Sequence, residues 1–288
     1  MSRPESTIRP RRSLLFVPGL RPDRYAKALD AGADIVCVDL EDAVALDRKD
    51  EGRKLTLPLF GQATHPQVER MVRINSISTL HGLKDLQAIL ESLAPPPSLM
   101  IPKVKSAEEI QLLDTILSTA ATQHIRFCVI IETNQGLERA ADIARASDRI
   151  DSLILGGVDM SADLRCQKAW EPLLYARSRL VHAAAGAGID LLDVPYLNLD
   201  DPEGLQREAQ GCARLGFTGK ASIHPNQLAI IHEAFTPTSE QIARAKKCVA
   251  AFEQSPSGLV VVDNELLELP VIRSMKRILA IAERVGAK

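Results

Sequence analysis

Short runs of β-branched and other apolar residues alternate along the chain with longer segments whose apolar positions recur at helical spacing. The apolar runs lie at residues 13–17, 35–39, 71–74, 99–104, 127–131, 152–155, 189–194 and 218–223. Most are followed by a helical pattern, such as residues 79–93 or 107–119. This alternation is typical of βα units that build a parallel sheet. Eight such runs favour a closed barrel over an open doubly wound sheet.

Two of the predicted strands carry a residue that is uncommon in a strand interior. Pro102 lies in the run at 99–104, and Lys220 lies in the run at 218–223. Proline is tolerated near a strand end, and polar residues are expected where a barrel strand reaches the C-terminal mouth. Both strands are therefore retained, and the predicted fold class is α/β, a TIM (β/α)8 barrel with a C-terminal helical extension.

The chain continues well beyond the eighth predicted strand. After a helix that ends near Phe235, the sequence predicts a turn with a helix N-cap at 236–240, a helix to about Gln254, a strand-like run at 259–262 and a helix at 270–285. We expect a catalytic barrel domain at 1–235 and an extension at 236–288. An appendage of this size is too small to fold alone, so it should pack on the barrel or on a neighbouring subunit.

Composition and charge narrow the class of protein. With 288 residues and 45% hydrophobic content, the chain can bury one large core. The formal net charge of -2 provides no overall basic field for nucleic acid or an anionic membrane, and no apolar run is long enough to span a bilayer. The five cysteines are scattered and odd in number, which favours a reducing compartment. We expect a soluble, cytoplasmic protein.

Polar residues stand at or just beyond the ends of most of the predicted strands, where barrel enzymes carry their reactive groups. They are Asp39, Glu41 and Asp42 after the second strand, Arg73 and Asn75 at the third, Lys103 in the fourth, Glu132 after the fifth, Asp159 after the sixth and Asp193 in the seventh. Several acids and bases around one mouth would suit a small anionic substrate together with a divalent cation.

Glu132 and Asp159 follow apolar strands one βα unit apart, so their carboxylates should stand side by side. Two carboxylates leave most of an octahedral shell open, an arrangement that Mg²⁺ prefers to a cage of protein ligands. The alternative is that one acid caps the next helix while the other pairs with Arg73. Zinc is disfavoured because the six histidines show no metal-ligand spacing.

Basic residues offer two candidate anion sites. Arg73 could clamp a carboxylate or 2-oxo acid, pair with Asp39 or Glu41, or do both. Asp39 and Glu41 are then expected to hold Arg or Lys side chains, or metal-bound water, rather than the metal itself. Arg24 and Lys27, soon after the first strand, could meet phosphates or form a solvated helix face.

Several segments together resemble the citrate lyase beta subunit-like group of the HpcH/HpaI aldolase/citrate lyase superfamily, which includes malyl-CoA and citramalyl-CoA lyases. They are RRSLLFVPG, DLEDAVALDRKDEGR, RINS, IIETNQG, LGGVDMSADLR and GKASIHP, in order over nearly the whole chain. The resemblance implies a TIM barrel that uses Mg²⁺ to cleave a 3-hydroxy-acyl thioester into an acetyl thioester and a 2-oxo acid. It also implies a homo-oligomer, commonly a trimer or hexamer.

The resemblance assigns roles to individual residues of this chain. Glu132 and Asp159 match the family's metal ligands, and Arg73 matches the arginine that holds the 2-oxo acid. Positions where the family contacts the CoA portion are occupied by Phe16, Arg24, Lys27, Ile223 and His224.

One position departs from the family pattern. The CoA lyases carry a C-terminal Asp two residues before a Pro, offered into the neighbour's active site, whereas this chain has Glu268 before Leu269-Pro270. Glu268 is then either the acid/base of the reaction or an exposed acid capping the helix that follows.

The substrate is open among several alternatives. We favour citramalyl-CoA, because His224 resembles the free-standing CoA lyases more than the subunit of a citrate lyase complex, which uses an acyl-carrier protein thioester. The other hypotheses are a malyl-CoA lyase, a pyruvate-class aldolase without a thioester, and a noncatalytic paralogue that binds a 2-oxo acid or CoA.

Overall fold

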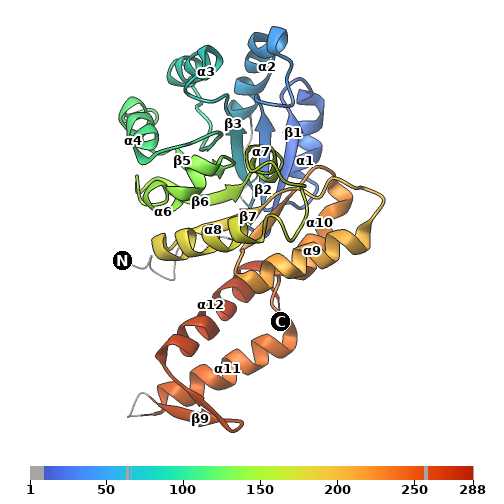
Figure 1. Ribbon diagram of the computed structural model, residues 1–288, viewed down its shortest axis with the longest axis vertical. Helices are drawn as coiled ribbons and strands as arrows, with labels where there is room; N and C mark the ends of the chain where they lie inside the picture. The colour runs from blue at the N-terminus through green and yellow to red at the C-terminus, as the bar shows by residue number, and fades with distance from the viewer. Residues whose placement is uncertain (1–9, 63–64, 66, 256–258, 288) are drawn as a thin grey trace. The chain divides into compact units, whose positions relative to one another are not determined.

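The computed structural model describes residues 10–62, 65, 67–255 and 259–287, and a closed barrel of parallel strands forms the centre of the compact unit Arg11–Ala234 (Figure 1). Within these residues the barrel strands are β1 (Ser13–Pro18), β2 (Ile35–Asp39), β3 (Glu69–Arg73), β4 (Ser98–Ile101), β5 (Arg126–Ile131), β6 (Ile150–Leu155), β7 (Asp190–Asp193) and β8 (Gly219–Ser222). Each strand pairs with the next in sequence, and β8 pairs with β1 to close the barrel. The predicted TIM barrel is confirmed.

Apolar side chains fill the inside of the barrel. Every strand contributes at least one of them to a single buried cluster of Leu14, Ile35, Cys37, Met71, Met100, Cys128, Ile130, Ile154, Leu192 and Ala221. The cysteines of this cluster are free thiols that act as small core residues. A packed interior of this kind leaves the two ends of the barrel as the places where polar groups gather.

Helices surround the strands in the alternating order that the sequence predicts (Figure 1). In the described chain up to Phe235 they are α1 (Tyr25–Leu29), α2 (Lys49–Thr56), α3 (Leu80–Leu90), α4 (Ala107–Ile116), α5 (Asn134–Glu138), α6 (Ala140–Ile143), α7 (Gly157–Asp163), α8 (Leu174–Ala187), α9 (Pro202–Leu215) and α10 (Leu228–Phe235). Side-chain caps begin several of them: Thr79 accepts a hydrogen bond from Gly82 N, and Asp201 accepts one from Gly204 N.

The fourth strand is shorter than predicted. The expected strand at 99–104 ends at Ile101, one residue before Pro102, which has no N–H to donate to a neighbouring strand. Lys103 therefore lies beyond the strand, and its φ of 57° places it in the left-handed region.

The chain divides into two compact units, Arg11–Ala234 with the barrel, and a second unit that contains the chain from Phe235 onward. The second unit consists of α11 (Ser239–Glu253), the antiparallel strands β9 (Val260–Val262) and β10 (Glu265–Leu267), and α12 (Leu269–Val285). Thr238 and Gln241 form a capping box at the start of α11. Cys248, Val262, Leu267 and Ile272 are the buried core of this unit.

The second strand of this hairpin was missed from the sequence, which predicted a strand-like run at 259–262 without a partner. Asp263 and Asn264 connect β9 and β10, with φ values of 51° and 64°. A two-residue turn of this geometry requires positive φ at both positions, and Asp and Asn adopt it more readily than other non-glycine residues.

None of the described helices is both long and apolar enough to cross a membrane.

The N-terminal end of the barrel is closed by one buried arginine. Arg11 is 5% exposed, and its guanidinium contacts Glu69 at 2.8 Å, Asp151 at 3.0 Å and Asp190 at 3.0 Å. Burial opposes the charge, but the three carboxylates raise the pKa of Arg11, so that it stays protonated. Three strands are thereby tied to the residue that precedes β1.

Replacing Arg11 by Met should destabilise the protein by about 3–5 kcal/mol, because three acids would lose their shared buried cation. Urea unfolding of the full chain measures the change. The matched control is Arg48→Met, which breaks an ion pair that is half exposed on both sides and should change stability by less than about 1 kcal/mol. Equal effects of the two substitutions would contradict the role assigned to Arg11.

Candidate active site

A cavity of about 910 Å³ lies at the C-terminal ends of the barrel strands. Of the residues singled out from the sequence, those that line it are Phe16, Arg24, Lys27, Asp39, Asp42, Arg73, Glu132, Asp159, Ile223 and His224. Glu41 is buried beside the cavity, and Glu268 belongs to the second unit. The barrel therefore brings together side chains that are separated by about 200 residues in the chain.

Arg73 at the end of β3 is held by two acids from the segment at the end of β2. Its Nε donates to Asp39 Oδ1 at 2.7 Å and its Nη2 donates to Asp39 Oδ2 at 2.5 Å, while Nη1 lies 3.0 Å from Glu41 Oε2. The Phe16 ring lies 5.2 Å from the guanidinium carbon. Burial disfavours the charge, but Asp39 and Glu41 raise the pKa of Arg73.

These contacts leave part of the guanidinium available. An arginine has five N–H donors in a fixed plane, and the hydrogen bonds to Asp39 engage two of them, while Nη1 forms ion pairs with Glu41 at 3.0 Å and with Asp42 at 3.8 Å. N–H groups on both terminal nitrogens therefore form no hydrogen bond with a described residue, and Arg73 lines the cavity in which a ligand could accept one. The two interpretations of Arg73, ion pair and anion clamp, are therefore compatible, because the acids orient the side chain without using all its donors.

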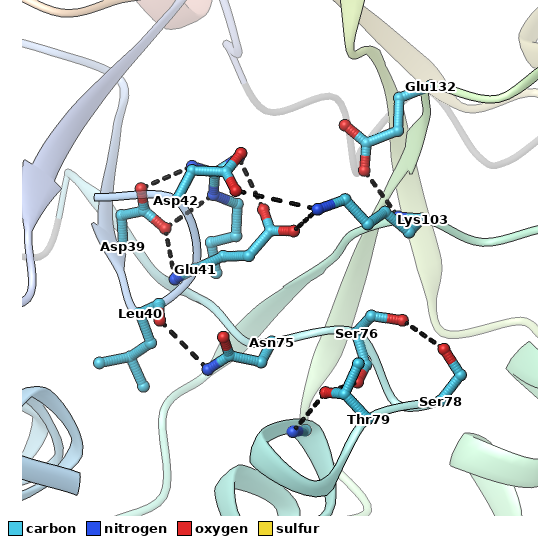
Figure 2. A network of polar contacts seen from close by, with 12 residues as sticks. Asp39, Leu40, Glu41, Asp42, Asn75, Ser76, Ser78, Thr79, Lys103 and Glu132 are labelled. Carbon is cyan, nitrogen blue, oxygen red and sulfur yellow. Dashed lines mark hydrogen bonds and ion pairs between the residues drawn. The ribbon is translucent and has the colours of Figure 1, made fainter. Parts of the chain in front are cut away.

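Glu41 joins Arg73 to Lys103. Its Oε1 lies 2.7 Å from Lys103 Nζ, and Lys103 Nζ is also 3.8 Å from Asp42 Oδ1 (Figure 2). Burial raises the pKa of Glu41, and the charges of Arg73 and Lys103 act against that shift. Asp39 and Glu41 thus hold basic side chains, which is the kind of contact expected of them from the sequence.

Glu132 at the end of β5 is a buried carboxylate close to other acids. It is 2% exposed, and its Oε1 accepts a hydrogen bond from the backbone N–H of Lys103 at 2.7 Å (Figure 2). Burial raises the pKa of Glu132 to about 8, and the negative charges of Glu41 and Asp159 contribute to the rise. The ionised carboxylate is therefore costly here unless a cation comes close to it.

Asp159 completes this acidic pair. It lies in the first turn of α7 and lines the large cavity together with Glu132; both also line a smaller neighbouring cavity of about 470 Å³. Among the described residues none forms a hydrogen bond or ion pair with the Asp159 carboxylate, so its oxygens are open to a ligand. Within the residues that the structure describes, no group of three or more His, Cys, Asp or Glu side chains is arranged to hold a metal ion.

Gly156 makes room for this arrangement. A β-carbon at this position would lie 2.4 Å from Glu132 Cβ and 2.5 Å from Glu132 Oε2, closer than atoms can approach. Any larger residue would therefore displace the Glu132 side chain. The sequence places this glycine after the sixth strand but does not show why it is needed.

Two residues that the sequence placed at the mouth lie elsewhere. Asp193 is fully buried between β7, β8 and α8, where it contacts Lys220 Nζ at 2.6 Å and Arg177 Nε at 3.0 Å, and it does not line the cavity. Asn75 is also buried, and its side-chain amide donates to Leu40 O at 3.1 Å and to Asp85 Oδ2 at 2.7 Å. Both hold the barrel together instead of facing a ligand.

The wall of the cavity depends on a residue that the sequence did not single out. Gln227 is buried, accepts a hydrogen bond from Ile223 N at 3.0 Å and donates one to Tyr196 O at 2.8 Å. It therefore ties together the loops that follow β7 and β8, both of which line the cavity. A lone glutamine near the start of a helix carries no sequence signal for this role.

Glu268 stands at the N-cap position of α12 and is exposed. Within the described residues its side chain forms no capping hydrogen bond with that helix. The structure thus offers no support for the interpretation of Glu268 as a helix cap, and its part in a reaction stays a prediction.

A (β/α)8 barrel with paired carboxylates and a clamped arginine at its mouth defines the class of barrel enzymes that handle small anionic substrates. A profile of the family described as HpcH/HpaI aldolase/citrate lyase matches residues 12–225. The chain belongs to this family. Because the activities in the family's description break carbon–carbon bonds, the chain is a carbon–carbon lyase.

Relatives match over nearly the whole chain. The citrate lyase subunit beta of Leuconostoc mesenteroides subsp. cremoris is 33% identical over 94% of this chain and 93% of its own length. The mitochondrial citramalyl-CoA lyase of Rattus norvegicus is 32% identical over 97% of this chain and 88% of its own. The Mycobacterium tuberculosis protein CitE, solved with magnesium, acetoacetate and coenzyme A, is 30% identical, with a TM-score of 0.78 over 96% of this chain and 98% of that one.

The buried ion pairs of Asp193 should make the stability of the protein depend on pH. Burial alone would raise the pKa of Asp193, but Lys220 and Arg177 lower it to about 2, below the ordinary value of 3.8. The stabilisation is therefore present above about pH 4 and disappears as the pH falls through about 2. Asp193→Asn should cost about 2–3 kcal/mol at neutral pH, and less at about pH 3.

Urea unfolding of the wild type and the variant at both pH values measures this difference. Asp200→Asn in the loop after β7 is the control, because Asp200 is an exposed acid whose side chain has no hydrogen bond or ion pair within the described residues, and its stability effect should be within about 0.5 kcal/mol. A cost for Asp193→Asn that stays constant across this pH range would contradict the assigned pairing.

Proposed function

We propose that the protein catalyses the Mg²⁺-dependent cleavage of citramalyl-CoA to acetyl-CoA and pyruvate. The observation that carries the proposal is the convergence of Glu132, Asp159 and Arg73 on one cavity of about 910 Å³. A cavity of this size suits a substrate with an extended carrier arm. Family membership and the similarity to a citramalyl-CoA lyase support the choice of reaction.

Glu132 and Asp159 are the residues that would hold the metal. The fit is supported by the buried Glu132, whose ionised form is disfavoured by burial and by the charges of Glu41 and Asp159, and by the Asp159 carboxylate at the same cavity. Two carboxylates without histidine or cysteine are oxygen donors of the kind that Mg²⁺ takes. When bound, Mg²⁺ would act as a Lewis acid on the hydroxyl and carboxylate oxygens of the substrate.

Arg73 would orient the substrate carboxylate. Its N–H groups that form no hydrogen bond with a described residue lie on both terminal nitrogens of one planar guanidinium, a geometry that matches the two oxygens of a carboxylate. Asp39 and Glu41 fix that plane before the substrate arrives, so little side-chain freedom is lost on binding. The same contact would hold the carboxylate of the pyruvate product.

The carbon–carbon bond breaks toward an acetyl thioester enolate. The substrate hydroxyl loses its proton to water and becomes the carbonyl of pyruvate, while the electron pair of the broken bond passes to the thioester fragment. That fragment takes up one proton at carbon to give acetyl-CoA. Glu268 is our candidate for the acid that delivers this proton, either from its own chain or from a neighbouring subunit of a homotrimer or hexamer.

The CoA portion would lie along the first and eighth βα loops. Arg24 and Lys27 are exposed basic residues on the cavity wall, and Ile223 and His224 line the wall beyond β8. The bases suit the phosphates of CoA, and the exposed Ile223 and the ring of Phe16 suit its apolar parts. The free state of all five cysteines is compatible with action in the cytoplasm.

A citrate lyase beta-type reaction, with oxaloacetate as product and an acyl-carrier protein as thioester carrier, is the second candidate. The relative named citrate lyase subunit beta, at 33% identity, favours it. The two reactions share the metal site and Arg73 and differ in the carrier and in the 2-oxo acid. A direct comparison of substrates therefore separates them.

Incubation with citramalyl-CoA, malyl-CoA and citryl-CoA, with and without Mg²⁺, tests the function. We expect Mg²⁺-dependent release of acetyl-CoA and pyruvate, fastest from citramalyl-CoA. Glu132→Gln should lower that rate by more than about 100-fold, since changes to residues that only support a ligand already cost 10–100-fold. Undiminished turnover in this variant would remove the metal site, and oxaloacetate as the main product would favour the second candidate.

Glu268→Gln tests the proton donor. The loss of the acid should lower kcat by about 100-fold or more, with Mg²⁺ affinity unchanged. Glu265→Gln is the control, because Glu265 is also an exposed acid of the second unit and pairs with Arg244. A kcat for Glu268→Gln equal to that of the control would show that another group delivers the proton.

A further inference from the structure

Lys103 has a backbone conformation that is unfavourable for a lysine. Its φ is 57°, in the left-handed region where a β-carbon crowds the following carbonyl oxygen. The described non-glycine residues that share this property are Asp263 and Asn264 in the hairpin turn, and the exposed Arg165. Lys103 alone among these four stands at the candidate active site. Strained backbone of this kind persists where the surroundings fix it, often at functional positions.

The conformation lets one residue serve two carboxylates. The backbone N–H of Lys103 donates to Glu132 Oε1 at 2.7 Å, while Nζ of the same residue lies 2.7 Å from Glu41 Oε1 (Figure 2). Pro102 just before it ends the β4 pairing, so the N–H of Lys103 is not committed to a sheet partner. Figure 2 shows Lys103 between Glu41 and Glu132.

The backbone contact of Lys103 supports Glu132, and its side-chain contact supports Glu41 and, through it, Arg73. Among the described residues Lys103 is the one that donates a hydrogen bond to Glu132, so its N–H sets the direction of that carboxylate. A hydrogen bond from N–H to an ionised acceptor is charge-assisted and directional. The ammonium holds Glu41, which in turn contacts Arg73 Nη1. Lys103 thus connects the acidic pair with the anion clamp.

We propose that Lys103 is a positioning residue whose left-handed backbone aims the Glu132 carboxylate at the divalent cation, and whose ammonium sets Arg73 through Glu41. The inference rests on the proposed function, because it assumes that Glu132 holds the metal. It assigns separate effects to the backbone and to the side chain of one residue. Substitutions that separate the backbone conformation of Lys103 from its side-chain charge test the proposal.

Lys103→Gly and Lys103→Val form the matched pair for the backbone. Both remove the ammonium, but glycine adopts positive φ freely, whereas a β-branched residue strongly disfavours it. Calorimetric titration of the full chain with MgCl₂ should give a dissociation constant for Lys103→Gly within about threefold of wild type. Lys103→Val should bind about 10–100-fold more weakly, as for loss of other groups that orient a metal ligand.

The control for backbone strain alone is Arg165→Val, at an exposed left-handed position that lines neither cavity. It should lower the unfolding temperature as Lys103→Val does, without changing the Mg²⁺ dissociation constant. If Lys103→Val does not fold, Lys103→Thr replaces it, since threonine is also β-branched, disfavours positive φ more than lysine does, and should bind Mg²⁺ more weakly than the glycine variant.

Lys103→Met tests the side chain. It removes the ammonium but keeps an unbranched side chain, so the backbone constraint is that of lysine. Mg²⁺ affinity should stay within about threefold of wild type, while KM for pyruvate in the condensation direction rises by about tenfold because Glu41 loses a partner. Lys103→Arg should restore KM toward the wild-type value, since it keeps the cation.

The outcomes separate this inference from the proposed function. No Mg²⁺ uptake by the wild type would remove the proposed function itself. Uptake by the wild type with equal affinities for the glycine variant and a folded β-branched variant, valine or threonine, would overturn the backbone role of Lys103. A pyruvate KM unchanged in Lys103→Met would overturn the role of its ammonium.

Discussion

The site depends on one physical constraint, the burial of the Glu132 carboxylate beside other acids. Burial and the nearby charges of Glu41 and Asp159 raise the pKa of Glu132 to about 8, which makes its charged form unfavourable unless a cation is present. The surrounding structure maintains this carboxylate in place. Gly156 provides the space that it occupies, and the backbone of Lys103 fixes its direction. An acid held in this way favours its neutral form, and a nearby cation would shift it toward its ionised form.

The arginines at the two ends of the barrel differ in how fully their N–H groups are paired. At the N-terminal end, Arg11 is surrounded by Glu69, Asp151 and Asp190, and the result is a closed structural contact. At the C-terminal mouth, Arg73 keeps N–H groups unused although two acids hold it. An arginine whose guanidinium is surrounded by acids stabilises the scaffold, whereas an arginine with unused N–H groups can still bind a ligand. This contrast distinguishes the functional end of the barrel from the structural end.

The second unit carries the feature by which this chain departs from its family pattern. Glu268 is exposed at the start of α12, next to a short hairpin whose turn uses Asp263 and Asn264. In the proposed reaction, a Glu where the resemblance leads us to expect an Asp would move the carboxyl group by one methylene, a displacement that would matter for proton transfer. Glu268 lies between Leu267 and Ile272, two residues of the buried core of this unit.

The sequence by itself determined the barrel, the eight strands and the family, because apolar periodicity and ordered motifs are properties of the linear chain. It also named the residues at the cavity, since the carboxyl ends of parallel strands share one mouth. Only the tertiary structure decided which strand-end acids face the cavity: Asp193 turns to Lys220 and Arg177 instead. The left-handed Lys103, the need for Gly156 and the second hairpin strand also required it, because each follows from contacts between distant segments or from a backbone angle that residue type does not specify.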